Sequence, residues 1–539
     1  LYTDHQNREK FSEIYKKITK SSTEYENLVR DKKYFIITKR MFGELNNLMH
    51  YLEVTDLLPH EDEISHGKIR EALAYFLVFY PVYRVYGNKL PLIQDDLNII
   101  QNALQDAENH ASYLSKEIDY LRKLFNGKAD GNETYNENKL YFLMRCQQIA
   151  GPLAAKGVED TAFYIYNRLI SHNEVGDSPN IFGITTDQFH DKMLDRLERN
   201  PLSINTTATH DTKRGEDARV RINVLSEIPE EWEQMMEQWR AVNKKYIKES
   251  ENGKMPTPND EYYIYQTLIG AFPMNGEQEE DNLQERVKEY MIKVTREAKV
   301  NTSWAEPKEE YENAVTAFTE SILENQDFLD TFIPFMQKIA HYGAIYSLAQ
   351  ALIKITAPGI PDIYQGCELW DLSMVDPDNR RTVDFDLRNQ YLDKIELKWK
   401  DQDFRKEILN NPEDGLIKMF TVHKALQHRR QAHELFSKGD YIPLQFKGKN
   451  ASHAFGFVRK RGQMWSLVVV PGLLVKEEFL NNTKPDFTFW SDTNVVLPEE
   501  APHKWKNIFT NTDVNISKEH NLQEIFENFP VILLHGNSE

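Results

Sequence analysis

The stretch NTTATHDTKRGEDARVR, residues 205–221, is compatible with two structures, because small polar residues run into a His-Asp pair and then into a charged, helix-like segment. A strand that delivers a carboxylate to the mouth of a barrel of parallel strands has this pattern. An ordinary turn in which Asp211 caps a helix beginning at Thr212 has it as well. The rest of the sequence must decide between them.

The bulk composition indicates a folded protein that acts on a neutral ligand. The chain has 539 residues, enough for two to four domains, and 40% of them are hydrophobic, so a large core is expected. The formal net charge of -19 disfavours non-specific binding to nucleic acid or to an acidic membrane surface, because the electrostatic contribution would be repulsive.

The cysteines, the apolar runs and the histidines argue against a disulfide-rich, a membrane-spanning or a metal-dependent protein. Cys146 and Cys367 are far apart, which excludes a disulfide framework and favours cytoplasmic residence. The longest apolar run, residues 73–83, is too short to span a bilayer. The histidines have no metal-ligand spacing and no Gly-rich phosphate loop occurs, so neither metal nor cofactor is predicted.

The beginning of the chain predicts a helical subdomain over residues 1–147. Apolar residues recur at i, i+3, i+4 and i+7, first at Phe11, Ile14, Tyr15 and Ile18 and again within 42–52 and 114–125. The first residue is Leu, and no signal-peptide pattern follows it. We therefore expect the chain to be a fragment of a longer protein.

The middle of the chain, residues 148–437, alternates short strand candidates with helical segments. Polar clusters follow the strand candidates in three units, 149–160, 202–214 and 361–372. This pattern is typical of a parallel α/β barrel, whose catalytic groups lie on the loops after the strands. Three units cannot close a barrel of eight, so we expect only part of one.

The end of the chain, residues 438–539, turns to short runs of aromatic and β-branched residues separated by turns. These runs predict strands, and the region is expected to be a small β-sandwich domain. They lie at 441–446, 454–460, 464–471 and 532–535.

Three segments carry a resemblance to a known family. Residues 151–177, 207–232 and 358–388 contain KGVEDTAFY, THDTKR and VDPDNRR in this order. In combination they resemble the maltooligosyltrehalose synthases of the α-amylase superfamily. The resemblance implies an α/β fold with a partial (β/α)8 TIM-type barrel, about strands 6–8, a large helical insertion and a C-terminal all-β domain.

The same resemblance implies a reaction, and it implies that two catalytic groups of that reaction are missing from this sequence. The family converts the reducing-end α-1,4 bond of a linear α-1,4-glucan, a maltooligosaccharide, to an α-1,1 bond by intramolecular transglycosylation. No Arg-x-Asp of a fourth strand and no matching fifth-strand Glu is found here. Because retaining chemistry needs a nucleophile and an acid, the chain is predicted to be inactive alone. An α-amylase-type hydrolase, another glucan transglycosylase, or a non-catalytic glucan-binding protein are the alternatives.

The remaining catalytic carboxylate is Asp211, which resembles the third, seventh-strand carboxylate that grips the sugar hydroxyls. Hydrogen bonds to an ionised group are about twice as strong as neutral ones, and bonds that tighten in the transition state lower the barrier. His210 resembles the family's donor to a ring hydroxyl. The competing interpretation remains the helix cap described above.

The loop after the expected eighth strand supplies further candidates. Asp376 and Arg380 are predicted to clamp a sugar, although a surface ion pair would have the same pattern. Trp370 could stack on a pyranose face or belong to the core, and Tyr364 and Glu368 lie in the same loop. Cys367 is not expected to act as a nucleophile.

The loop after the expected sixth strand is predicted to hold the released glucose and exclude water. Lys156, Asp160, Phe163 and Tyr164 are its candidates, and a buried Lys–Asp pair supporting the barrel is the alternative. Lys213 and Arg214 could reach the same pocket, or could pair with acidic neighbours on a solvated helix start. The oligomeric state stays open.

Overall fold

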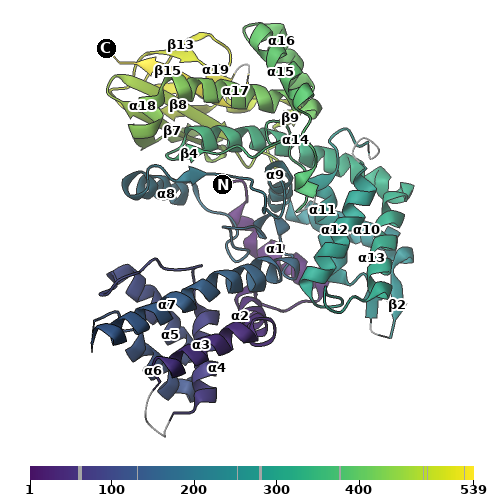
Figure 1. The fold of residues 1–539 in the computed structure, drawn as a ribbon. Helices are drawn as coiled ribbons and strands as arrows, with labels where there is room; N and C mark the ends of the chain where they lie inside the picture. Colours follow the sequence, from purple (N-terminus) through teal and green to yellow (C-terminus); the bar gives the residue numbers. More distant parts are fainter. Residues whose placement is uncertain are drawn as a thin grey trace. The chain divides into compact units, whose positions relative to one another are not determined.

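The computed structural model describes residues 1–58, 64–129, 132–251, 253–277, 282–375, 378–477, 479–481, 483–526 and 529–538. The chain divides into two compact units, which are described separately here. Unit 1 comprises 1–21, 167–293 and 308–539, and unit 2 comprises 22–166 and 294–307. Figure 1 shows the elements of both units in the colours of the sequence.

Unit 2 is a helical bundle with its own apolar core. Its helices are α2 (Tyr25–Phe35), α3 (Phe42–Val54), α4 (His66–Phe79), α5 (Gln94–His110), α6 (Ser115–Leu124) and α7 (Glu133–Ala154). Leu73, Leu104, Leu121 and Phe142 are fully buried, and α4 contacts α5, α6 and α7. The helices predicted within 42–52 and 114–125 are confirmed.

The strand predicted within 149–160 is wrong. Helix α7 continues to Ala154, and a π-helical turn, η4 (Ala155–Glu159), extends it. The small residues serve helix packing instead of a strand, because a Cβ on Gly157 would lie 2.8 Å from Lys33 Cγ of α2. The predicted boundary at 147/148 therefore falls inside a helix, and the helical unit also includes residues 294–307.

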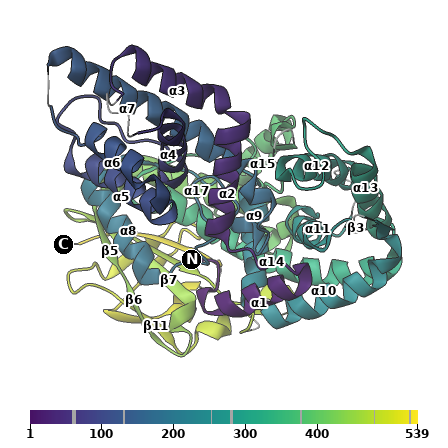
Figure 2. The same cartoon turned by 90° about the horizontal axis from the view of Figure 1, so that it is seen from below.

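Helices form the larger part of unit 1. They are α1 (Arg8–Thr19), α8 (Thr186–Arg199), α9 (Glu216–Val224), α10 (Pro229–Asn243), α11 (Pro258–Ala271), α12 (Leu283–Ala298), α13 (Glu309–Leu323), α14 (Gln326–Thr356), α15 (Phe385–Lys398), α16 (Gln402–Asn410), α17 (Leu416–Gln431), α18 (His433–Lys438) and α19 (Leu522–Phe526). The predicted face of α1 is confirmed, since Phe11, Ile14, Tyr15 and Ile18 are all buried. Helices α10, α11 and α14 lie together in Figures 1 and 2, and Trp232, Trp239 and Phe332 fill the space between them.

A short parallel sheet lies where the two other strand units were predicted. Strands β1 (Ile204–Asn205) and β4 (Ile360–Pro361) pair in parallel, with Ile204 opposite Ile360. Gly359 precedes β4 with a φ of 121°, and a Cβ there would lie 2.6 Å from the Asn205 side chain. Among the described residues β1 pairs only with β4, so the structure shows two parallel strands and not three.

The C-terminal region is β-rich from Asp440 onward, as predicted. A six-stranded sheet has the order β13-β12-β15-β8-β7-β5, and a three-stranded sheet has the order β14-β11-β6. The central strands β7 and β8 are almost entirely buried, and α8 packs on β5 while α14 packs on β8. The strands are β5 (Asp440–Pro443), β6 (Gln445–Gly448), β7 (Ala454–Arg461), β8 (Met464–Pro471), β11 (Thr493–Val496), β12 (Lys504–Asn507), β13 (Asp513–Asn515), β14 (Glu519–Asn521) and β15 (Ile532–Asn537).

Two small ladders complete the strand content of the described residues. Strands β2 (Lys248–Ser250) and β3 (Gly253–Met255) form one antiparallel pair, and β9 (Leu480–Asn481) and β10 (Lys484–Pro485) form the other. Neither ladder is hydrogen-bonded to the parallel pair of β1 and β4 in the described residues.

Stability is expected to fall with acid because of a buried histidine between α17 and the six-stranded sheet. His428 Nε2 lies 3.2 Å from Ser466 Oγ, and burial lowers the pKa of His428 to about 3. The unfolded state, with a histidine pKa near 6.5, binds more protons below that pH, so stability present above about pH 6.5 is lost as pH falls. His428 contributes at most about 1.4 kcal/mol per pH unit to the slope of the free energy of unfolding against pH.

Urea unfolding at several pH values between 7 and 4 measures this slope. The variant His428→Gln should show a smaller slope than the wild-type protein. The slope is reduced rather than abolished, because burial also lowers the pKa of His535, whose ring packs on His428. Equal slopes in the two proteins would refute this assignment.

Candidate functional site

The turn after β1 carries the His-Asp pair. Asp211 N–H donates to Thr209 Oγ1 at 3.2 Å, and Thr212 Oγ1 donates to the Thr209 carbonyl at 3.0 Å. Helix α9 begins only at Glu216, with Gly215 as its N-cap. The helix-cap interpretation of Asp211 is therefore wrong, and both His210 and Asp211 are exposed on the turn.

A buried carboxylate, Glu174, fixes the far end of this turn. The Lys213 N–H lies 2.9 Å from each Glu174 carboxylate oxygen, and the Arg214 N–H donates to Oε2 at 3.3 Å. Burial raises the pKa of Glu174, and the neighbouring Arg219 guanidinium, 3.4 Å from Oε2, opposes the rise. No sequence motif indicates this residue, because the turn that it holds lies about forty positions away.

Arg214 lies inside unit 1 and not at a solvated helix start. Its Nη1 donates to the Ile170 carbonyl at 2.8 Å and its Nη2 donates to Tyr263 Oη at 2.5 Å. Lys213 is also buried. The predicted alternative, pairing with acidic neighbours in solvent, is wrong because Glu216 and Asp217 are themselves 1% and 2% exposed.

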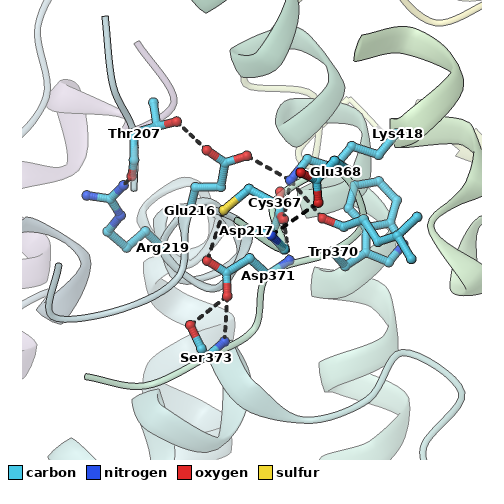
Figure 3. Close-up of polar contacts among 12 residues, drawn as sticks. Thr207, Glu216, Asp217, Arg219, Cys367, Glu368, Trp370, Asp371, Ser373 and Lys418 are labelled. Carbon is cyan, nitrogen blue, oxygen red and sulfur yellow. Dashed lines mark hydrogen bonds and ion pairs between the residues drawn. The ribbon is translucent and has the colours of Figure 1, made fainter. Parts of the chain in front are cut away.

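Glu216 and Asp217 begin α9 inside a buried group of charges, here called the α9 charge cluster, which also contains Lys354 and Lys418. Lys418 Nζ lies 2.7 Å from Glu216 Oε1 and 2.6 Å from Asp217 Oδ2. Lys354 Nζ lies 2.9 Å from Glu216 Oε2. Figure 3 shows Lys418 reaching both carboxylates from α17.

The charges of the cluster balance at two positive and two negative groups. Burial alone would raise the pKa of Glu216, but Lys418 and Lys354 together hold it below its usual value. Burial raises the pKa of Asp217, which shares Lys418 with Glu216 and has no second lysine. One of the two alternatives drawn from the sequence placed these acids on a solvated helix start, and neither alternative predicted the cluster.

The loop after β4 is seated on the N-terminus of α9. Asp371 N–H donates to Asp217 Oδ2 at 2.6 Å, and the Gly215 N–H donates to the Ser373 carbonyl at 2.8 Å. The approach is so close that a Cβ on Gly215 would lie 2.3 Å from the Asp371 carbonyl oxygen. Ser373 Oγ in turn donates to Asp371 Oδ1 at 2.6 Å (Figure 3).

Trp370 and Glu368 are held in this loop by further bonds. Trp370 is half-buried, and its Nε1 donates to the Pro412 carbonyl at 2.6 Å. Glu368 Oε2 accepts from Arg388 Nε at 2.9 Å, and Tyr364 is half-buried nearby in the chain. Burial, with Asp371 adding to it, raises the pKa of the Cys367 thiol, which disfavours the thiolate that a nucleophile needs.

The segment carrying Arg380 is anchored by a buried ion pair. Arg286 Nε and Nη2 each donate to Asp378 at 2.7 Å, and Asp378 also accepts from the Met374 N–H at 2.8 Å. Asn379 Nδ2 donates to the His210 carbonyl at 2.9 Å, which ties this segment to the turn after β1. Arg380 is exposed, and the predicted clamp residue Asp376 lies outside the described residues.

Four predicted site residues belong to unit 2, whereas the others belong to unit 1. Lys156 Nζ lies 2.6 Å from Asp160 Oδ2, and the Lys156 side chain is 63% exposed, so the alternative of a buried Lys–Asp pair is wrong. Lys299 Nζ donates to the Asp160 carbonyl at 2.8 Å. Phe163 and Tyr164 are buried in the same unit.

Two other kinds of site are absent from the described residues. Within the described ranges, no group of three or more His, Cys, Asp or Glu side chains is arranged to hold a metal ion. No helix in the described part of the chain is long and apolar enough to cross a membrane.

Comparison with known proteins finds similarity in both sequence and fold. A Mycobacterium tuberculosis protein named as a maltooligosyl trehalose synthase is 33% identical over 391 residues, which are 72% of this chain and 45% of that protein. The maltooligosyltrehalose synthase of Arthrobacter ramosus matches in structure with a TM-score of 0.79 at 28% identity, over 99% of this chain and 62% of that one. A Sulfolobus tokodaii protein, described as a hypothetical maltooligosyl trehalose synthase, has a TM-score of 0.71 at 29% identity, over 99% and 60%. No family model matches the chain.

These similarities confirm the resemblance predicted from the three segments. They also show that the chain spans only 45% of the curated relative and 62% of the Arthrobacter ramosus structure.

Proposed function

We propose, from this similarity to maltooligosyltrehalose synthases, that the chain is the C-terminal part of an enzyme of that activity and forms one side of its glucan site. The enzyme would convert the reducing-end α-1,4 bond of a maltooligosaccharide to α-1,1 by intramolecular transglycosylation. The observation that carries the proposal is the bond from Asn379 Nδ2 to the His210 carbonyl. It joins the two loops that hold the predicted sugar-binding side chains.

The parallel pair of β1 and β4 supports a place at the rim of a barrel. Both strands run in the same direction, and the loop after each carries predicted site residues. Ile204 is 68% exposed and Ile360 is 45% exposed, although strands of parallel sheets are normally covered on both faces. A cavity of about 380 Å³ beside β1 is lined by Ile204, Phe189 and Lys354 among others. We infer that further strands, supplied from outside this sequence, cover this surface in the whole enzyme.

Six of the predicted residues, all in unit 1, take roles in this proposal. Asp211 is the third carboxylate, and His210 donates to a ring hydroxyl beside it. Trp370 and Arg380 contact sugar from the second loop. Lys213 and Arg214, being buried, support the turn. The nucleophile and the acid/base come from outside this sequence, so the chain is inactive alone.

Binding of maltopentaose tests the proposal directly. Asp211→Asn keeps the shape of the side chain and removes its charge, so we expect the dissociation constant to rise about tenfold, as for one lost charge-assisted hydrogen bond. Asp211 is exposed, so the melting temperature should not change. Titration calorimetry measures the affinity and a thermal scan measures the stability.

The matched control is Asp403→Asn, which alters a side chain that is 92% exposed on α16. It should bind maltopentaose as the wild-type chain does. Absence of binding by the wild-type chain, or equal affinity of the Asp211→Asn variant, would contradict the proposal. A hydrolase of the same superfamily would differ in product and not in this result, so product analysis of the whole enzyme separates the two.

A further inference from the structure

The α9 charge cluster touches both loops of the proposed glucan site. Thr207, at the start of the turn, donates its hydroxyl to Glu216 Oε2 and accepts from Lys354 Nζ at 2.8 Å. Its carbonyl also accepts from Arg219 Nη2. The turn that carries Asp211 is therefore connected to the cluster through the Thr207 side chain, four residues before the carboxylate.

The second loop is connected to the same cluster through backbone groups. Lys418 Nζ donates to the Leu369 carbonyl at 3.0 Å, and the Asp371 N–H donates to Asp217 Oδ2. Leu369 and Asp371 are the two neighbours of Trp370 in the chain. Lys418 thus bonds one carboxylate that holds the turn, a second that holds the loop, and the loop itself.

We infer that Lys418, Glu216 and Asp217 are positioning residues of the glucan site, which set the turn of residues 206–214 against the loop of residues 362–375. The inference rests on the proposed function. The three side chains are 0% to 3% exposed, so none of them contacts a sugar. They act through Thr207 on Asp211 and through Leu369 and Asp371 on Trp370.

The arrangement explains why two carboxylates and two lysines lie in a core. A buried ion pair is seldom more stable than an apolar pair of equal volume, because removing the charges from water costs about as much as their attraction returns. Charged groups do, however, impose direction: Glu216 accepts from Thr207, Lys354 and Lys418, which belong to three different segments. Thr207, Lys354 and Lys418 come from a turn and from α14 and α17 respectively.

The test uses a variant that disturbs the link and not the core. Thr207→Val removes the hydroxyl at nearly constant volume, and Thr207→Ser restores it. We expect Thr207→Val to weaken maltopentaose binding about tenfold and to speed amide exchange of residues 208–214 by a similar factor. Thr207→Ser should be close to the wild-type chain in both measurements.

The matched control is Thr319→Val on α13, where a fully buried threonine hydroxyl donates to the Val315 carbonyl at 2.9 Å. It loses the same group outside the cluster, so it should leave binding and the exchange of residues 208–214 unchanged. Equal exchange in Thr207→Val and wild type would overturn the inference. The inference would also be overturned if Thr207→Ser or Thr319→Val weakened binding and sped amide exchange as much as Thr207→Val does.

The two readouts separate this inference from the proposed function. Amide exchange is measured without any sugar, so it tests positioning of the turn by itself. Binding by the wild-type chain tests the glucan site by itself. If the wild-type chain fails to bind maltopentaose, the proposed function is overturned, and the exchange result still decides whether the cluster positions the turn.

Discussion

Replacement of the central lysine, Lys418→Met, is expected to lower the free energy of unfolding by about 3–5 kcal/mol, the usual cost of removing one partner from a buried ion pair. The Lys418 side chain is 0% exposed and donates to Glu216, Asp217 and the Leu369 carbonyl. Methionine has a similar volume, so the loss comes from two buried carboxylates left with one lysine and not from a cavity. Urea unfolding followed by circular dichroism measures the change.

The control for this prediction is an ion pair in solvent. Lys338 Nζ lies 2.7 Å from Glu231 Oε2, and the two side chains are 40% and 38% exposed. Lys338→Met should lower the free energy of unfolding by no more than about 1 kcal/mol. A second change, Asp217→Asn in the Lys418→Met background, should recover part of the loss, because it removes one of the uncompensated charges. Equal costs for Lys418→Met and Lys338→Met would show that the cluster does not depend on its central lysine.

Local patterns in the sequence predicted much of the fold. The stripe of Phe11, Ile14, Tyr15 and Ile18 is buried on one face of α1, because a helix exposes every third or fourth residue to the same neighbour. The apolar runs 454–460 and 464–471 are central strands, because strands buried on both faces lose the alternation of polar residues. These properties depend on neighbours only a few positions away.

The errors arose where distant partners decide the structure. The segment 149–160 reads as a strand by its small residues, but Gly157 accommodates α2, which is more than a hundred positions away in the chain. Glu216 and Asp217 read as a solvated helix start, although Lys418 lies about two hundred positions further on. Periodicity can assign such a lysine to a helix, but it contains no information about the carboxylate that it meets.

The candidate site was partly predictable for the same reason. His210, Asp211, Trp370 and Arg380 are predicted site residues in the segments that carry the resemblance, and they lie on two loops that are hydrogen-bonded to one another. Glu174, Arg286 and Asp378 were missed as supporting residues, because each works through backbone groups or through one distant partner. A motif records the groups that meet a ligand more readily than those that hold a loop in place.

The chain alone is expected to bind maltopentaose but to convert it at least about 10⁶-fold more slowly than a complete enzyme does. This is the usual loss of rate when a nucleophile and its acid are missing. Asp211 can stabilise charge on a sugar, but retaining chemistry also needs a carboxylate that attacks the anomeric carbon and a group that protonates the leaving oxygen, and the proposed function places both outside this sequence. Incubation with maltopentaose, followed by an assay of reducing ends and separation of products, measures the conversion.

The same preparation must bind maltopentaose, so that a failure to fold is not mistaken for a lack of catalytic groups. Loss of reducing ends with a non-reducing product at a normal rate would show that this chain holds its own nucleophile and acid. Conversion that appears only when the chain is combined with a polypeptide corresponding to the remaining part of the Arthrobacter ramosus synthase would place those two groups outside it.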